Sequence, residues 1–413
     1  MIIAGIKDKL QALSFASKMD GEEKPTTYDY KGVEVSTTTN NAFAVLDDFI
    51  VVAPVPALVE KIIDTEQGAP SLQDQGIEPQ FSLDQPFIQA FIPSYANLMT
   101  LATAEQGAQG LSPQLQASLS MISNIGYALD FEDNQIQIQG TMDIDPAAIS
   151  KQQPTMFTST AIKKLPADTL MMVNMDLSRF NQGWSAMVEA SQEIPESKRV
   201  FDGIRNLVKR FTGLNLEEDL VNWMDEEFAL AIIPSSKPLV PQFPISGNFL
   251  VGTSKPAEAT KSLTKLDSFI QKSVRPNMVN KSQTKVDGKD ITQWDTFQKQ
   301  TVFSYGWLDK NTLLTSIGDS VGNTAIGKGQ SLDQNPKFKE LASQFPQKNF
   351  GYFYWNLADS VKLIPPAQLQ LSTPGQQSFI QSLDAALTTS FFLDDDTIEY
   401  NSIITLSPPE SQN

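Results

Sequence analysis

The chain has 413 residues, 40% of them hydrophobic, which is enough to bury the cores of two or three domains of roughly 150 residues each. Its 48 acidic residues outnumber the 31 basic ones, and the net charge of -17 disfavours contact with nucleic acid or anionic lipid. Because there is no Cys and no His, the sequence excludes disulfides, Cys/His zinc sites, His-ligated haem and Ser-His or Cys-His catalytic pairs.

No segment has the pattern of a signal peptide or a membrane span. Residues 1–6 are apolar but are followed by Lys7, Asp8 and Lys9, whereas a signal peptide places its basic residues before an apolar run of about 7–15. The apolar stretch 43–59 is broken by two aspartates and two prolines, and a spanning helix needs about 20 apolar residues. The chain by itself is therefore expected to be soluble.

Short matches recur between the two ends of the chain. Residues 30–35 resemble 286–291, residues 71–75 resemble 331–335, and residues 129–136 resemble 391–398. Two further matches, 6–13 with 262–269 and 91–98 with 354–361, fall in the same order. Ordered matches with a slowly drifting separation predict two tandem copies of one structural unit.

The matches also predict the domain boundaries. We expect residues 1–147 to be the C-terminal part of the first copy, residues 148–164 a linker, residues 165–406 a complete second copy and residues 407–413 a frayed tail. Since residues 165–256 have no counterpart at the front, we expect the first copy to be truncated at its N-terminus. An upstream signal or membrane anchor could belong to the missing portion.

In the second copy, strand and helix patterns alternate along the chain. We predict strands at 169–177, 228–233, 248–252, 301–307, 312–317 and 350–355, hairpins around Asp287-Gly288 and over 387–406, and helices at 180–211 with a break near Pro195, 216–224, 256–273, 319–326, 336–345 and 376–386. Strands that meander between helices predict an α+β fold, with a mostly antiparallel sheet covered by helices on one face.

The second half of the predicted helix 180–211 has a regular apolar stripe. Val200, Ile204, Leu207, Val208 and Phe211 follow the spacing i, i+4, i+7, i+8 and i+11. This spacing predicts a helix that buries one face in the core.

Two motifs have the spacing of catalytic nucleophiles. Residues 318–322 match G-x-S-x-G, but no His exists to act as base, and Ser262 with Lys265 matches S-x-x-K without the K-T-G of penicillin-binding enzymes. We therefore interpret the first as a strand-to-helix turn and the second as part of an amphipathic helix. No catalytic, cofactor-binding or metal-binding residue is assigned.

Two acidic clusters occupy equivalent places in the proposed copies. Asp394, Asp395 and Asp396 correspond to the carboxylates of residues 130–133. Such oxygen ligands could hold calcium, but the spacing is not that of a calcium loop. We expect solvated hairpin turns.

One strand is strongly aromatic on both of its faces. Phe350, Tyr352 and Trp355, with Phe353 and Tyr354 between them, lie in the predicted strand 350–355. Burial between the sheet and its helices would explain this composition, and so would a groove for an apolar ligand such as a lipid or pigment. The sequence favours packing and leaves the groove as the alternative.

In three segments the sequence resembles an uncharacterised bacterial family, frequent in cyanobacteria, known as domain of unknown function 3352. They are the opening Leu165-Pro166-Ala167-Asp168-Thr169, the hairpin Lys285-Val286-Asp287-Gly288 and the strand-turn-helix of residues 312–326. The resemblance spans most of residues 1–406. It implies a membrane-associated protein that faces the periplasm or the thylakoid lumen, and it supplies no catalytic residues.

Our leading hypothesis is a non-enzymatic, extracytoplasmic protein that binds another protein as a scaffold or assembly factor. The alternative is a carrier of an apolar small molecule, lipid or pigment, in a groove between sheet and helices. A His-free hydrolase ranks third. No cofactor, metal or nucleic acid is expected, and the oligomeric state stays open.

Overall fold

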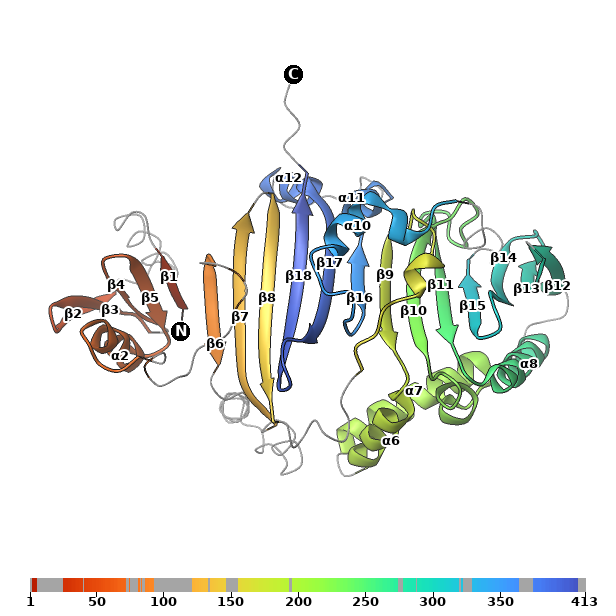
Figure 1. Ribbon diagram of the computed structural model, residues 1–413, viewed down its shortest axis with the longest axis horizontal. Helices are drawn as coiled ribbons and strands as arrows, with labels where there is room; N and C mark the ends of the chain where they lie inside the picture. Colours follow the sequence, from red (N-terminus) through yellow and green to blue (C-terminus); the bar gives the residue numbers. More distant parts are fainter. Residues whose placement is uncertain are drawn as a thin grey trace, which may run out of the picture. The chain divides into compact units, whose positions relative to one another are not determined.

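The structure, a computed structural model, describes residues 2–5, 25–39, 41–71, 74, 81, 83, 86–92, 121–132, 134–145, 155–192, 195–273, 278–286, 288–318, 321, 329–363 and 374–407. The chain divides into two compact units (Figure 1). Unit 1 comprises residues 1–145 and 396–399, and unit 2 comprises residues 146–395 and 400–413. Large antiparallel sheets with helices confirm the predicted α+β class.

Unit 1 contains a five-stranded antiparallel sheet in the order β1-β5-β4-β3-β2. Its strands are β1 (Ile2–Gly5), β2 (Thr26–Tyr30), β3 (Val33–Thr37), β4 (Ala42–Val45) and β5 (Phe49–Ala53). Helix α2 (Pro56–Glu66) begins with a proline, which suits the first helical turn, and buries Val59 and Ile63 against β3, β4 and β5. The β2–β3 turn places Lys31 and Gly32 at positive φ, 53° and 87°, as a tight hairpin requires.

Unit 1 also contains three further antiparallel strands. They are β6 (Ile88–Ile92), β7 (Ile122–Glu132) and β8 (Gln135–Ile144), in the order β6-β7-β8. Asn134 has a φ of 62° at the β7–β8 turn, a conformation that Asn tolerates better than most residues. The acidic residue Glu132 is exposed at the end of β7, in agreement with a solvated turn.

Unit 2 is built on ten strands in the order β12-β13-β14-β15-β11-β10-β9-β16-β17-β18. They are β9 (Met171–Asp176), β10 (Glu227–Pro234), β11 (Ile245–Gly252), β12 (Val279–Val286), β13 (Lys289–Thr296), β14 (Thr301–Trp307), β15 (Thr312–Ile317), β16 (Tyr352–Trp355), β17 (Leu383–Phe392) and β18 (Thr397–Leu406). The pairs from β12 to β17 are antiparallel. Gly288, at a φ of 78°, confirms the predicted hairpin between β12 and β13.

The two faces of this sheet differ. Met172, Leu250, Leu314 and Tyr354 point to one face, where α10 (Pro336–Ala342), η2 (Ala161–Lys163) and η4 (Leu332–Gln334) complete a closed core. At one end of the opposite face, α8 (Pro256–Ser273) and the short π-helix η3 (Glu217–Val221) pack on β11 and β15. Helices therefore cover both faces of the sheet, and the prediction of cover on one face only was wrong.

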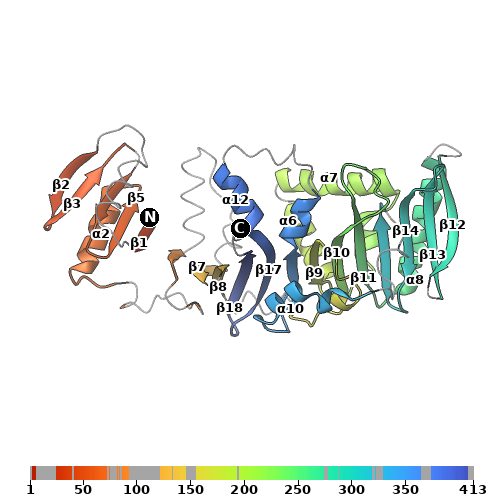
Figure 2. The same cartoon turned by 90° about the horizontal axis from the view of Figure 1, so that it is seen from above.

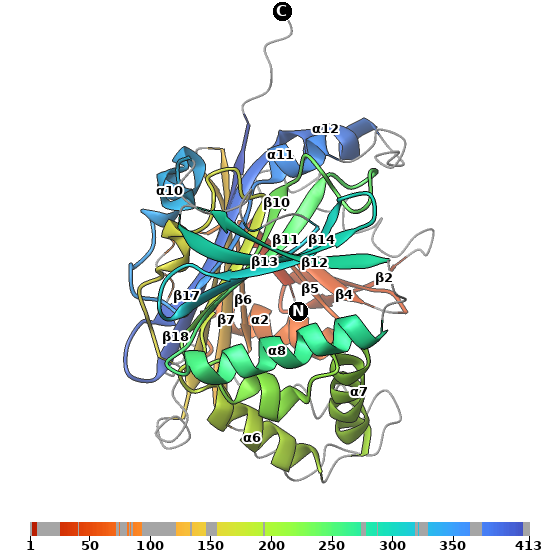
Figure 3. The same cartoon turned by 90° about the vertical axis from the view of Figure 1, so that its right-hand side faces the viewer.

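The remaining helices lie at the ends of the unit 2 strands. They are α6 (Phe180–Ser191), α7 (Pro195–Thr212), α11 (Leu357–Lys362) and α12 (Pro374–Ser382). Figures 1 and 3 show α6, α7 and α8 at one end of the strands and α11 and α12 at the other. Figure 2 shows α10 on one side of this sheet, and α7 and α12 on the opposite side.

The structure corrects the expected role of the 180–211 segment. It forms two helices, α6 and α7, with the break near Pro195 as predicted. The apolar stripe of α7, however, is not buried: Val200, Ile204, Leu207 and Phe211 are exposed, and Val208 is half-buried. Amphipathic spacing identified the helix but not what its apolar face contacts.

Several predictions concern the connecting segments. The part of the predicted linker that is described, residues 155–164, is held in unit 2, since Phe157 pairs with Asn349 and Ser159 donates to Glu227 at 2.6 Å. The predicted helix at 376–386 ends at Ser382, where β17 follows. Most of the predicted helix 319–326 and of the tail 407–413 lies outside the described residues.

Candidate functional site

Beyond the part covered by α8 and η3, the second face of the unit 2 sheet carries apolar side chains that the strand register brings together. Residues opposite each other in an antiparallel ladder point to the same face. Between β16 and β9, Trp355 is opposite Met171 and Phe353 is opposite Val173. Across the next two strands, Leu230 of β10 is opposite both Val173 of β9 and Phe249 of β11. We call this surface the open face; its side chains are Met171, Val173, Met175, Leu230, Ile232, Phe249, Ile317, Phe353 and Trp355.

Exposure varies along the open face. Trp223 and Leu263 cover the neighbouring end of the sheet, where Val251 and Leu313 are buried. Toward the other end, Ile317 is 46% exposed and Trp355 is 39% exposed. An apolar surface of this kind, partly covered and otherwise in solvent, is a feature of protein and ligand interaction sites.

The three aromatic residues singled out in the sequence do not form one cluster. Tyr352 points into the closed core, where its ring lies 5.8 Å from that of Phe338. Phe350, just before the strand, stacks edge-to-face on Phe392 with the centroids 5.0 Å apart. Trp355 alone of the three lies on the open face, and its indole N–H donates to Ser360 Oγ at 3.1 Å.

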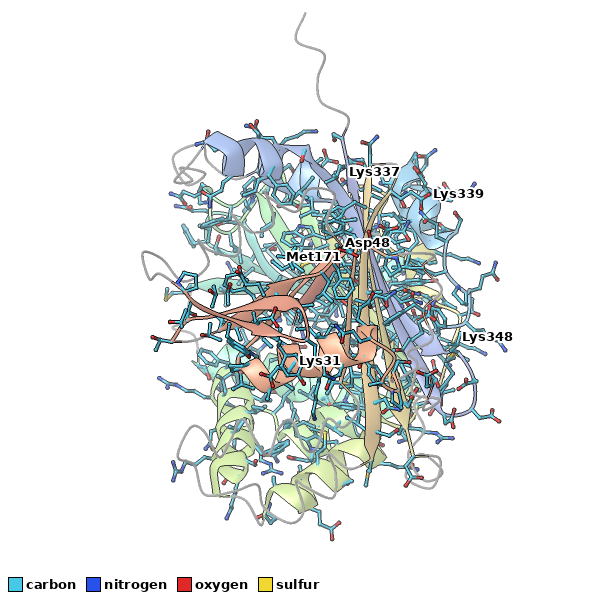
Figure 4. The ribbon with its side chains drawn as sticks, turned by 90° about the vertical axis from the view of Figure 1, so that its left-hand side faces the viewer. Lys31, Asp48, Met171, Lys337, Lys339 and Lys348 are labelled. Carbon is cyan, nitrogen blue, oxygen red and sulfur yellow. The ribbon has the colours of Figure 1, made fainter. Side chains whose placement is uncertain are left out.

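The sequence analysis did not identify the other side chains of the open face, because they come from several strands. Met171 (labelled in Figure 4) and Val173 alternate with buried Met172 and Asn174, which is the period of a strand with two different faces. That alternation was visible in the sequence. Which strands lie beside it was not, because the register joins β9 to β16, about 180 residues later in the chain.

A polar cavity of about 220 Å³ lies in unit 2, beside the ends of β10 and β11. Its central carboxylate is Glu227, which accepts hydrogen bonds from Ser159 Oγ at 2.6 Å, from Thr160 N at 2.8 Å and from Asn174 Nδ2 at 2.9 Å. These donors use the carboxylate to hold the segment before η2 on the sheet. We therefore interpret Glu227 as structural.

The same cavity contains an ion pair. Lys164 Nζ lies 2.9 Å from Asp309 Oδ2, and the backbone N–H groups of Asn311 and Thr312 donate to Asp309 Oδ1. Burial raises the pKa of Asp309, but these hydrogen bonds and the Lys164 ammonium outweigh it and lower the pKa to about 2. Within the cavity, the charge of Asp309 is thus neutralised by Lys164.

The S-x-x-K pair is divided between two structural contacts. Ser262 Oγ, buried in α8, donates to the Glu258 carbonyl at 3.3 Å, one helical turn earlier. Lys265 Nζ forms an ion pair with Asp219, whose pKa it helps to lower against the effect of burial. Neither side chain contacts the other in a nucleophile–base arrangement.

The other sequence motifs are explained by exposure or fall outside the described residues. Asp394, Asp395 and Asp396 lie exposed between β17 and β18, and within the described residues no cluster of three or more carboxylates is placed to hold a metal ion. Of the G-x-S-x-G motif, residues 319, 320 and 322 are outside the described part. Among the described helices, none has the length and apolar character needed to cross a membrane.

Comparisons with known proteins identify the family of the chain. No curated protein matches the sequence significantly. Two solved structures of TP0453, crystal forms I and III, are each 12% identical, with TM-scores of 0.28 and 0.25; they cover 62% and 61% of this chain, and 81% and 79% of TP0453. These scores are too low to support an argument. The model of the proteins of unknown function DUF3352 matches residues 1–406, and the chain therefore belongs to that family.

Proposed function

We propose that the protein is a non-enzymatic, extracytoplasmic binding protein that acts as a scaffold or assembly factor for another protein. The observation that supports this function best is the open face of unit 2, where apolar side chains of β9, β15 and β16 are exposed. Burial of Trp355 and Ile317 by a partner would remove apolar surface from water at a site rich in aromatic residues and Met.

The charged groups of unit 2 support a binding role over a catalytic one. Asp267 accepts hydrogen bonds from Lys281, Trp294 and Tyr305, and Lys337 pairs with Asp384 at 2.6 Å. Figure 4 shows Lys337 and Lys339 on α10, the helix of the closed core. These contacts stabilise the fold and leave the apolar side chains as the chemically distinctive surface.

A carrier of an apolar small molecule is the second candidate, and the same face supports it. Met171 and Met175 are flexible and polarizable, and such side chains adapt to irregular apolar ligands. Tyr352 argues against an enclosed groove at β16, because it is buried in the closed core.

Photo-crosslinking in the native cells tests both candidates. Trp355→benzoylphenylalanine places a crosslinker on the open face, and Phe297→benzoylphenylalanine is the matched control, since Phe297 is 78% exposed in the β13–β14 loop. We expect a discrete protein adduct at position 355 and none at 297. An adduct of small mass that organic solvent extracts would support the carrier. No adduct at 355, or the same adduct at both positions, would contradict the proposed site.

The extracytoplasmic location is tested separately by cell fractionation. We expect the protein in the periplasmic or thylakoid-lumen fraction, and in envelope or thylakoid vesicles we expect it to resist added protease only while the vesicles are sealed. Recovery with the cytosolic markers would contradict this part of the proposal.

We also propose that the two ends of the chain are tandem copies. The order β1-β5-β4-β3-β2 in unit 1 parallels β11-β15-β14-β13-β12 in unit 2, and β8 begins at Gln135 as β18 begins at Thr397, with the separation predicted from the sequence. An experimental structure tests this: β2–β5 should superpose strand for strand on β12–β15. A different register in the two hairpins would contradict duplication.

A further inference from the structure

Helix α7 presents an apolar stripe to solvent. Val200 is 60% exposed, Ile204 41%, Leu207 60% and Phe211 67%. At roughly 100° per residue, these four positions fall within a narrow strip over three turns of the helix. Of α2, α6, α7, α8 and α12, α7 separates its apolar and polar side chains most completely.

A different side of α7 fixes it to unit 2. The Phe201 ring packs edge-to-face on Trp184 of α6 with the centroids 5.3 Å apart, and Arg205 pairs with Glu217 of η3 at 2.7 Å. Val208 and Thr212, which lie on this same side, are half-buried. The orientation of the helix is therefore set, and the stripe lies on a different side of the helix from the residues that hold it.

The charge of α7 is opposite to that of the protein. The chain has a net charge of -17, yet over residues 195–212 of α7 the five basic side chains outnumber the two acidic ones, Glu196 and Asp202; the basic ones are Lys198, Arg199, Arg205, Lys209 and Arg210. Arg205 takes part in the ion pairs of this helix. The other four are exposed, and no ion pair is found for them within the described residues.

Two of the exposed basic side chains, Arg199 and Arg210, lie beside the stripe, whereas Lys198 and Lys209 fall on the opposite side of the helix. Lys198 and Arg199 precede Val200, and Lys209 and Arg210 precede Phe211, whose ring lies 6.0 Å from the Arg210 guanidinium. By helical spacing, Arg199 and Arg210 border the stripe on one side. Long basic side chains in this position can extend toward anionic groups while their methylenes and the stripe contact apolar material.

We propose that α7 is a membrane-surface helix that binds unit 2 to a bilayer containing anionic lipid. An exposed apolar strip bordered on one side by exposed Arg, on a helix of low overall hydrophobicity that also carries exposed Lys, is the composition of helices that lie in the plane of the bilayer interface. A second copy of the chain is a poorer occupant, because it would place one cationic helix against another. The proposal goes beyond the function above and uses a different surface.

The uneven distribution of charge along the chain reconciles this binding with the negative net charge. The whole chain should be repelled by an anionic bilayer, so contact would be favoured at α7, which carries the largest net positive charge among the described helices. The acidic remainder would then orient the protein, with α7 toward the lipid.

Vesicle flotation of the full chain tests the proposal. We expect binding to phosphatidylcholine vesicles that contain roughly a third phosphatidylglycerol, and weak binding to phosphatidylcholine alone. Leu207→Ser with Phe211→Ser should weaken binding at least about tenfold, since two large apolar side chains no longer enter the interface. Arg199→Gln and Arg210→Gln should each weaken it by about fivefold.

The matched controls are the same kinds of substitution at exposed positions outside α7. Phe297→Ser changes an aromatic residue that is at least as exposed as Phe211, and Lys285→Gln removes an exposed charge from β12; both should leave binding unchanged. All of these positions are at the surface, so each variant should keep the circular dichroism spectrum and unfolding midpoint of the wild type.

A fluorescent label gives a readout that is independent of affinity. Because the chain has no Cys, Leu207→Cys provides a unique site for an environment-sensitive dye, and Lys209→Cys provides one on the opposite side of the helix. We expect a blue shift on anionic vesicles at position 207 and little change at 209. No flotation of the wild type, equal shifts at both positions, or a dimer that Leu207→Ser dissociates in the absence of vesicles would overturn the proposal.

Discussion

Gly351 lies against the backbone of Asn174, so closely that a Cβ atom at position 351 would come within 2.0 Å of the Asn174 carbonyl oxygen. Gly351 also has a φ of 116°, which side-chain-bearing residues rarely adopt. Asn174 is itself buried; its side-chain oxygen accepts from Tyr352 N at 2.7 Å, and its amide donates to Ser159 and Glu227. The glycine thus lets β9 and β16 meet where this buried network joins them.

Gly351→Ala should destabilise the protein by at least about 3 kcal/mol, because the clash is with backbone and the conformation is strained. Urea unfolding followed by circular dichroism measures this. Gly203→Ala is the control: Gly203 lies within α7, where an added Cβ would meet no neighbouring heavy atom within 4 Å, and alanine there should stabilise by about 0.5–1 kcal/mol. Equal effects of the two substitutions would show that the contact with Asn174 is not as described.

Glu227→Gln should destabilise the protein by about 2 kcal/mol. The carboxylate oxygen that accepts from Thr160 N and Ala161 N would be replaced by an NH2 group, so that donors would face donors. Exposed Glu218→Gln is the matched control and should change stability by less than about 0.5 kcal/mol. Chemical denaturation at neutral pH gives both values. If Glu227→Gln were neutral, the carboxylate would not be what holds the segment before η2.

Tyr354→Phe should leave the protein as stable as the wild type or more stable by about 1 kcal/mol. The residue is fully buried, its ring contacts Phe338, and no hydrogen-bond partner of its hydroxyl is found in the described structure. Tyr305→Phe makes the same change where the hydroxyl donates to Asp267 at 2.6 Å, and should destabilise by about 1–2 kcal/mol. Thermal unfolding of the two variants measures the difference in stability. A larger loss of stability in Tyr354→Phe than in Tyr305→Phe would show that the Tyr354 hydroxyl does have a hydrogen-bond partner.

Stability should fall in acid partly through Asp309. Its pKa is about 2 in the folded protein, below the value near 3.9 of an unfolded Asp, so its contribution is complete above about pH 4 and is lost as the pH falls toward 2. Since the side chain is 46% exposed, we expect about 1 kcal/mol after screening.

Asp309→Asn should therefore flatten the decline of the unfolding free energy between about pH 4 and pH 2. Asp290→Asn, at a side chain that is 78% exposed, serves as the control and should retain the slope of the wild type. Urea titrations at a series of pH values measure the difference. An unchanged slope in Asp309→Asn would show that its hydrogen bonds with Asn311 and Thr312 do not persist in solution.

Much of the local structure of unit 2 could be predicted from the sequence. Residues 256–273 form the predicted helix, and Gly288 forms the predicted hairpin, because helix spacing and turn chemistry are local properties. Of the predicted strand 350–355, residues 352–355 form β16, which has two different faces, whereas Phe350 lies before the strand.

The predictions that were wrong or incomplete concern contacts between segments that are distant in the sequence. Leu207 and Phe211 follow the spacing of a core helix, and only the packing of Phe201 and Arg205 shows that a different side is held. In the same way, Trp355 and Met171 meet on the open face through a register that no local pattern specifies. The proposed sites therefore lie where tertiary structure overrides the expected burial.

Strand β12 has a consequence for how this protein could assemble with others. It is the outermost strand of the unit 2 sheet, and its residues 280–285 are exposed; among them, the Lys285 side chain is 72% exposed, and Lys281 pairs with Asp267. Lysines on an outer strand oppose the addition of a strand from another chain, which would have to bury their charge. Recognition would then rely on side chains of the open face and α7, and the protein could remain concentrated in its compartment without growing into edge-to-edge fibrils.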